Sequence, residues 1–222
     1  MIPPTLLGAG DFHGGFARVA VDGPCAYFSM RPCVGPVMVG TPEEDDGKHK
    51  AKLHGCMFTF VDKTGRMISL NGYDYALEFG EGLAPVLVGD KWGYIDDTGE
   101  LAIAPQFERA QPFADGLALV MSEDKYGFID HSGKYVIPAQ FEQAESFAEG
   151  YAVVGTSDGT MAWYIDHDGR QAFGRKFTTA SSFFKGLAHV ELLPEKNAKR
   201  AKFEYIDHHG NRVFAYSQAA ED

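Results

Sequence analysis

The fold is decided by a stretch that the chain repeats, residues 91–124, which read KWGYIDDTGELAIAPQFERAQPFADGLALVMSED. One period later, residues 125–158 read KYGFIDHSGKYVIPAQFEQAESFAEGYAVVGTSD. A period of about 34 residues is typical of solenoids and propellers, in which each repeat is one supersecondary unit. The sequence therefore predicts a repeat architecture.

Each repeat contains a first half-motif of the form aromatic-x-(Tyr/Phe)-(Ile/Val)-Asp-x-x-Gly. In one copy, Ala162 stands in place of the leading aromatic residue. An Asp-x-x-Gly sequence between apolar flanks predicts a hairpin turn, because Asp accepts hydrogen bonds from turn amides and Gly adopts positive φ. We expect residues 92–96 and 101–104 to form one such hairpin. The five copies end at Gly65, Gly99, Gly133, Gly169 and Gly210.

A second half-motif, Phe-x-x-Gly-(hydrophobic)-Ala-x-Val, follows the first. Its five copies begin at Phe12, Phe79, Phe113, Phe147 and Phe183. The preceding spacing, Phe107-x-x-Ala110-x-x-Phe113, does not fit strand alternation and predicts a bulge or irregular segment. Strands such as residues 117–120 are apolar on both faces, so each sheet should be covered on both sides.

The order of the half-motifs indicates whether the repeats form a closed ring or an open stack. The chain begins with a second half, residues 6–19, and ends with a first half, residues 203–214. These complementary ends predict an all-β, five-bladed β-propeller closed by the N- and C-terminal half-units. The alternative is an open β-solenoid of β-hairpin repeats. We expect a single repeat domain over residues 1–222, with units at 203–218 plus 6–21 (composite), 56–90, 91–124, 125–160 and 161–202.

Residues 22–53 match neither half-motif and are interpreted as an inserted loop. Insertions in repeat proteins map to loops, which often lie on the binding face. The alternative is a tolerated loop without a role. The candidate binding residues of this insertion are Tyr27, Phe28, Arg31, His49 and His54.

Composition limits the class of partner and the compartment. The formal net charge of −11 disfavours a nucleic-acid binder, which needs a basic face. No leader peptide and no apolar run of about 20 residues is recognisable, so we expect a cytoplasmic protein that does not enter a membrane. The cysteines Cys25, Cys33 and Cys56 form no CxxC pair. We expect no metal site and no cofactor, with Cys33, Cys56, His49 and His54 as the weaker, metal-binding alternative.

The repeated polar residues carry no recognisable catalytic pattern. One aspartate recurs at the same turn position of each unit, which predicts turn capping in place of calcium binding or glycoside hydrolysis. The histidines that follow these aspartates are expected to be solvated. No GxSxG, phosphate loop, GxGxxG or HExxH motif occurs, so we predict no catalytic residues and no enzyme. The aspartates are Asp62, Asp96, Asp130, Asp166 and Asp207, and the histidines are His131, His167, His208 and His209.

The run Lys91-Trp92-Gly93-Tyr94-Ile95-Asp96, the Asp-x-x-Gly turn, Ile103-x-Pro105-x-Phe107 and the second half-motif together resemble bacterial WG-repeat proteins. The resemblance covers most of residues 58–214 and, in half form, residues 6–19. Trp-Gly itself occurs once, and other residue pairs replace it in the remaining units. The resemblance implies a β-rich repeat scaffold and brings no catalytic residues to transfer.

Three functions remain after these arguments. The first is a non-enzymatic scaffold of a bacterial cytosolic protein that binds a protein partner, of the immunity or adaptor type. The alternative is a carbohydrate or small-ligand module with equivalent pockets between repeats. The second alternative is a hydrolase with a site in a central channel. The sequence leaves the oligomeric state open.

Overall fold

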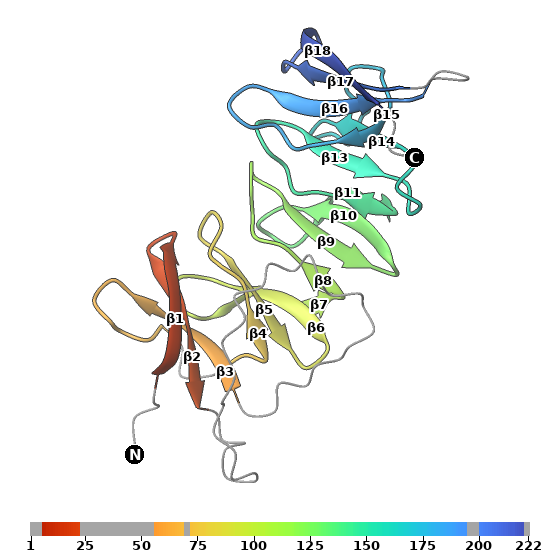
Figure 1. Cartoon of the computed structure of the whole chain (residues 1–222). Helices are drawn as coiled ribbons and strands as arrows, with labels where there is room; N and C mark the ends of the chain where they lie inside the picture. Colours follow the sequence, from red (N-terminus) through yellow and green to blue (C-terminus); the bar gives the residue numbers. More distant parts are fainter. Residues whose placement is uncertain (1–5, 23–55, 69–71, 195–199, 220–222) are drawn as a thin grey trace. The chain divides into compact units, whose positions relative to one another are not determined.

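The computed structural model describes residues 6–22, 56–68, 72–194 and 200–219 (Figure 1). These residues form antiparallel β-sheets, and no helix occurs among them. All five candidate binding residues of the insertion lie outside the described residues: Tyr27, Phe28, Arg31, His49 and His54. The chain divides into two compact units, Met1–Gln106 and Phe107–Asp222, which are described separately.

The first unit holds two sheets. One has the order β1-β2-β3, and the other has the order β4-β5-β6-β7. A core of buried aromatic and aliphatic side chains, including Phe60 and Phe79, joins residues of both sheets. The strands are β1 (Leu6–His13), β2 (Phe16–Asp22), β3 (Cys56–Asp62), β4 (Tyr75–Ala76), β5 (Ala84–Val88), β6 (Lys91–Ile95) and β7 (Leu101–Phe107).

The second unit holds a four-stranded sheet of order β11-β10-β9-β8 and a seven-stranded sheet that runs in sequence order from β12 to β18. The first comprises β8 (Arg109–Ala110), β9 (Ala118–Ser122), β10 (Lys125–Ile129) and β11 (Tyr135–Phe141). The second comprises β12 (Gln143–Ala144), β13 (Ala152–Gly155), β14 (Ala162–Ile165), β15 (Phe177–Ala180), β16 (Ala188–Leu192), β17 (Arg200–Ile206) and β18 (Arg212–Ala219).

Strand pairing joins each second half-motif to the first half-motif that follows it. β9 pairs with β10 through a two-residue turn in which Glu123 and Asp124 both have positive φ, the backbone of a type I′ hairpin. In the same way β2 pairs along its length with β3. The half-motif in residues 12–19 thus has its own hydrogen-bonded partner. Complementary chain ends are not needed to complete this sheet, and ring closure stays a prediction.

The Trp-Gly glycine has a steric role that the pairing explains. β6 neighbours β7, and β10 pairs with β11, so the predicted hairpins are confirmed. The register of β10 and β11 shifts twice, which pushes backbone of β11 against Gly127. A Cβ on Gly127 would lie 2.6 Å from Ala139 N and 2.8 Å from Ile137 O, and one on Gly93 would lie 2.5 Å from Ile103 O. The glycine is therefore required by close backbone approach.

Two further predictions are confirmed: the irregular segment at residues 107–113, and sheets that are covered by neighbouring sheets. The chain bends at Glu108, between β7 and β8. In the second unit, Phe128 and Ile137 of one sheet pack against Phe147 and Val154 of the next, and all four are buried. The packing of one sheet on the next thus buries apolar side chains of these strands.

Candidate binding surfaces

The repeated aspartates cap their own turns, as predicted. In the first copy, Asp62 Oδ1 accepts hydrogen bonds from Thr64 N (2.8 Å) and Arg66 N (3.0 Å). The other copies repeat this pattern with the second and fourth residue after the aspartate. In Asp62 these bonds stabilise the charged carboxylate and lower its pKa to about 2, with the Thr64 hydroxyl as the largest cause.

Three of the histidines in these turns are exposed or partly exposed, in line with the predicted contact with solvent, but each also packs on a ring, which was not predicted. Each stacks on the phenylalanine that begins a second half-motif, where it shields an aromatic face from water. The pairs are His131 on Phe113 (centroids 4.1 Å apart), His167 on Phe147 (4.4 Å) and His208 against Phe183 (4.8 Å). His208 Nε2 also lies 2.9 Å from Glu149 Oε2.

The first candidate surface is an aromatic cluster on one face of β16, β17 and β18, which lie side by side in the blue part of Figure 1. We call it the terminal aromatic face. The pairing brings its rings together, because Phe203 stands opposite Tyr216 and Tyr205 opposite Phe214. The Phe203 and Tyr216 rings stack with centroids 5.1 Å apart, and His189 Nε2 lies 2.9 Å from the Tyr216 hydroxyl. Its members are His189, Phe203, Tyr205, Phe214 and Tyr216.

This face is exposed where equivalent positions elsewhere in the chain are buried. Tyr205 is 37% exposed, whereas Phe128 and Tyr164 at the same motif position are at most 1% exposed. Phe214 is 58% exposed, whereas its counterpart Ile137 is 1% exposed. In the second unit, the phenylalanine of the next half-motif covers each earlier ring, as in the Phe128–Phe147 and Tyr164–Phe183 contacts.

The opposite face of the same sheet is closed by an ion pair. Glu204 occupies the position of the Trp-Gly glycine and is 6% exposed. It accepts a hydrogen bond of 2.6 Å from Arg175 Nη2, and Arg175 Nη1 donates to Gly210 O at 3.3 Å. There is room for this side chain because β17 and β18 pair residue by residue through Glu204, with a register shift only at Ile206. The terminal sheet is therefore anchored on one face and open on the other.

β18 is also the last strand of the seven-stranded sheet, with β17 as its neighbour. It is eight residues long, and its exposed side chains include Val213 and Phe214, each 58% exposed. An exposed edge strand presents backbone N–H and C=O groups that a further strand can pair with. The edge and the terminal aromatic face are adjacent, so one extended partner segment can contact both.

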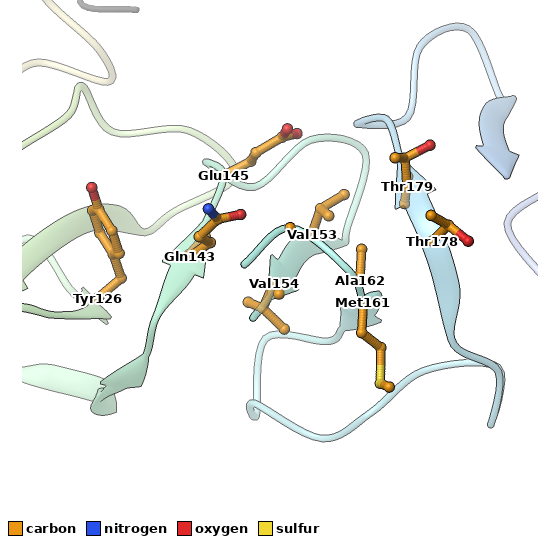
Figure 2. Close-up of a pocket in the computed structure, with 13 residues that line it drawn as sticks. Tyr126, Gln143, Glu145, Val153, Val154, Met161, Ala162, Thr178 and Thr179 are labelled. Atoms are coloured by element: carbon orange, nitrogen blue, oxygen red, sulfur yellow. The ribbon is translucent and has the colours of Figure 1, made fainter. Parts of the chain in front are cut away.

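The second candidate surface is a groove in the second unit with a volume of about 460 Å³ (Figure 2). Val153, Val154, Met161 and Ala162 line it with apolar groups. The polar lining comes from Tyr126, Gln143, Glu145, Thr178 and Thr179. Figure 2 shows Gln143 and Glu145 on one strand segment and the two threonines on another.

Local departures from the repeat explain why the groove lies here. Ala162 replaces the leading aromatic ring, and Trp163 replaces the glycine that lets the next strand approach in two other units. β14 accordingly pairs with β15 at a single position, Ala162 with Phe177. The turn before β14, residues 156–161, is longer than the two-residue turn between β9 and β10. The small side chain of Ala162 and the longer turn before it both lie in the lining of this hollow. Ala162 was visible in the sequence, but its consequence was not predicted.

The sequence-predicted metal alternative remains open. Among the residues that the structure describes, no group of three or more His, Cys, Asp and Glu side chains is placed to hold a metal ion. Cys33, His49 and His54 are outside that part of the chain, and the side chain of Cys56 is not described. The candidate binding residues of the insertion stay a prediction for the same reason.

Comparison with known proteins identifies the repeat. Residues 58–92, 92–126 and 126–156 match the family described as WG containing repeat. Over this stretch the predicted resemblance to WG-repeat proteins is confirmed. No curated protein matches the sequence. No helix among the described residues is long and apolar enough to cross a membrane.

Two solved structures share the fold at low sequence identity. One, described as the eukaryotic initiation factor, is 14% identical with a TM-score of 0.53, and the match covers 96% of this chain and 55% of that one. The other, Hsv2 of Kluyvelomyces marxianus, is 11% identical with a TM-score of 0.50 and coverages of 91% and 63%. The chain thus spans about half the length of the first of these proteins. Likeness at this identity concerns the fold alone.

Proposed function

We propose that this chain is a non-enzymatic repeat scaffold that binds a protein partner through the terminal aromatic face and the edge of β18. The observation that carries the proposal is the exposure of Tyr205 and Phe214, 37% and 58%, at positions that are buried in the preceding repeats. Exposed aromatic side chains gathered on one face are typical of protein interfaces.

The mode of binding that fits is strand addition. A partner strand pairs with the free edge of β18, which supplies main-chain hydrogen bonds, and places alternate side chains over the aromatic rings. Phe214 and Tyr216 lie on the same face of β18, two residues apart, and would contact those side chains. The affinity then comes from the backbone and the specificity from the rings.

The net charge and the turn aspartates indicate what class of partner and what role the protein has. The net charge of −11 favours a basic protein, whose approach it would accelerate. The repeated aspartates are engaged in their own turns, which supports a structural use of these carboxylates over a catalytic one. We place the protein in a bacterial cytoplasm, in an immunity or adaptor role.

Affinity purification from the native host tests the proposal. The double variant Phe214→Ser with Tyr216→Ser removes both rings of β18 and is expected to lose a stoichiometric partner that wild type retains. Val136→Ser is the matched control, because Val136 is 45% exposed in β11, outside the face. Equal recovery of the partner with all three proteins would contradict the proposal.

This function requires that the terminal aromatic face is open, as in the β-solenoid alternative. In the closed five-bladed propeller, residues 6–21 would cover it. Thiol labelling separates the two arrangements in a background without Cys25, Cys33 and Cys56. With Phe214→Cys, the open arrangement predicts labelling of the folded protein nearly as fast as of the unfolded chain. Closure predicts labelling slowed at least tenfold, on the order of the protection that burial gives.

A further inference from the structure

We propose that the groove beside Ala162 binds one neutral pyranose sugar. The site is separate from the terminal aromatic face and does not depend on the function proposed for it. Its volume of about 460 Å³ lies in the range of small-molecule sites, roughly 300–1,000 Å³. All of its lining residues fall within residues 126–180 of the second unit.

The inner wall of the groove is apolar. Val153, 7% exposed, and Ala162 pack in the same apolar cluster on one face of the sheet, whereas Val154, 1% exposed, packs in the cluster on the other face. A pyranose ring carries C–H groups on its faces, and burying them against such a wall is favourable by the hydrophobic effect. Tyr126, labelled at the far side of the groove in Figure 2, adds an aromatic edge.

The rim supplies hydrogen-bonding groups in the combination that hydroxyls need. Glu145 Oε2 accepts one hydrogen bond, of 2.7 Å from Ser182 Oγ, while a carboxylate offers about four acceptor sites. Gln143 Nε2 lies 3.4 Å from Ser157 O, a long contact that the amide can exchange for a ligand oxygen. Adjacent sugar hydroxyls can donate to the carboxylate and accept from the amide.

Two threonines complete the rim. Thr178 Oγ1 donates to Leu192 O at 3.2 Å, and Thr179 Oγ1 lies 3.4 Å from Glu191 Oε2. Their oxygens keep acceptor capacity for a ligand hydroxyl. The described residues that line the groove include no lysine and no arginine, so a phosphate or carboxylate ligand would find no cation there. The lining chemistry therefore favours a neutral polyhydroxylated ligand.

The origin of the groove implies one site per chain. It depends on Ala162, on Trp163 and on the turn of residues 156–161, and no other repeat combines these features. In the preceding unit Tyr126 and Gly127 hold the corresponding positions, with backbone packed against the glycine. This differs from the equivalent pockets between all repeats that the sequence suggested as an alternative.

Ligand-observed saturation-transfer NMR on the full chain tests the proposal, with methyl glucoside, methyl mannoside, methyl galactoside and N-acetylglucosamine as probes. Binding is then titrated by Trp163 fluorescence in a Trp92→Phe background, since the chain has two tryptophans. Ala162→Tyr restores the aromatic residue of the repeat and fills the groove. Glu145→Gln removes the carboxylate while keeping its shape, and Glu100→Gln, at an exposed position outside the groove, is the charge-matched control.

We expect at least one sugar to saturate a single site, with a dissociation constant on the order of 1 mM. Ala162→Tyr should weaken it at least tenfold without lowering the melting temperature, Glu145→Gln should weaken it several-fold, and Glu100→Gln should leave it unchanged. Absence of saturable binding for all four sugars would overturn the proposal, as would equal affinity in wild type and Ala162→Tyr. Neither result affects the terminal aromatic face, which the double variant Phe214→Ser with Tyr216→Ser tests separately.

Discussion

Replacement of Gly127 by alanine should destabilise the second unit strongly, although it adds one methyl group. The new Cβ would lie 2.6 Å from Ala139 N and 2.8 Å from Ala139 Cα. Both atoms are backbone of β11, so relief requires a shift of the strand. Overpacking of a filled interior usually costs about 1–3 kcal/mol, and a clash with backbone belongs at the upper end. We expect a loss of about 3 kcal/mol in the free energy of unfolding.

The assay is urea unfolding followed by circular dichroism, supported by thermal melts. For a chain of this size about 1 kcal/mol corresponds to roughly 2–4 °C, so the melting temperature should fall by about 6–12 °C. Gly116→Ala is the matched control, because Gly116 has a φ of +84° and nothing within 4 Å of the added Cβ. Its cost should be the backbone strain alone, about 1–2 kcal/mol. Equal destabilisation by the two substitutions would refute the close-approach argument.

Three further predictions concern charge and the chain terminus. Asp62 has a folded pKa of about 2, below the unfolded value of about 3.9, so its stabilisation is complete above about pH 5 and is lost as the pH falls towards 2. Urea midpoints should be flat from pH 7 to 5 and drop below about pH 4, and less steeply in Asp62→Asn. Arg175→Met should cost about 2–3 kcal/mol by leaving Glu204 buried without its 2.6 Å partner, and Glu204→Leu in the same chain should restore part of the loss. Deletion of residues 203–222 should broaden the unfolding transition and spare the first unit in an open arrangement, whereas a closed ring should lose stability throughout.

Each of these three predictions would be contradicted by a specific result. A pH profile that is the same in wild type and Asp62→Asn would show that the turn carboxylate does not contribute. Additive losses for Arg175→Met and Glu204→Leu would show that the two side chains do not act as a pair. One sharp transition at a much lower temperature, after deletion of residues 203–222, would favour the propeller over the solenoid.

The sequence determined the repeat, the turns and the strands, because these depend on neighbouring residues. Asp62 and Gly65 lie three positions apart and build one turn by themselves, so spacing was sufficient to predict it. Strands with apolar residues on both faces, such as residues 117–120, likewise predicted sheets covered on both faces. The resemblance to WG repeats rested on the same local patterns, and the family match over residues 58–156 confirms it.

Tertiary structure decided which groups meet. His131 and Phe113 are 18 positions apart in sequence, and only the pairing of β8 to β11 brings them into a stack of 4.1 Å. The burial of Phe128 and the exposure of Tyr205 follow from the presence or absence of a covering sheet, although both residues occupy the same motif position. The lining of the groove beside Ala162 comes from residues as far apart as Tyr126 and Ala180, which only the fold brings together. Distances and solvent exposure depend on long-range packing, which a local motif does not encode.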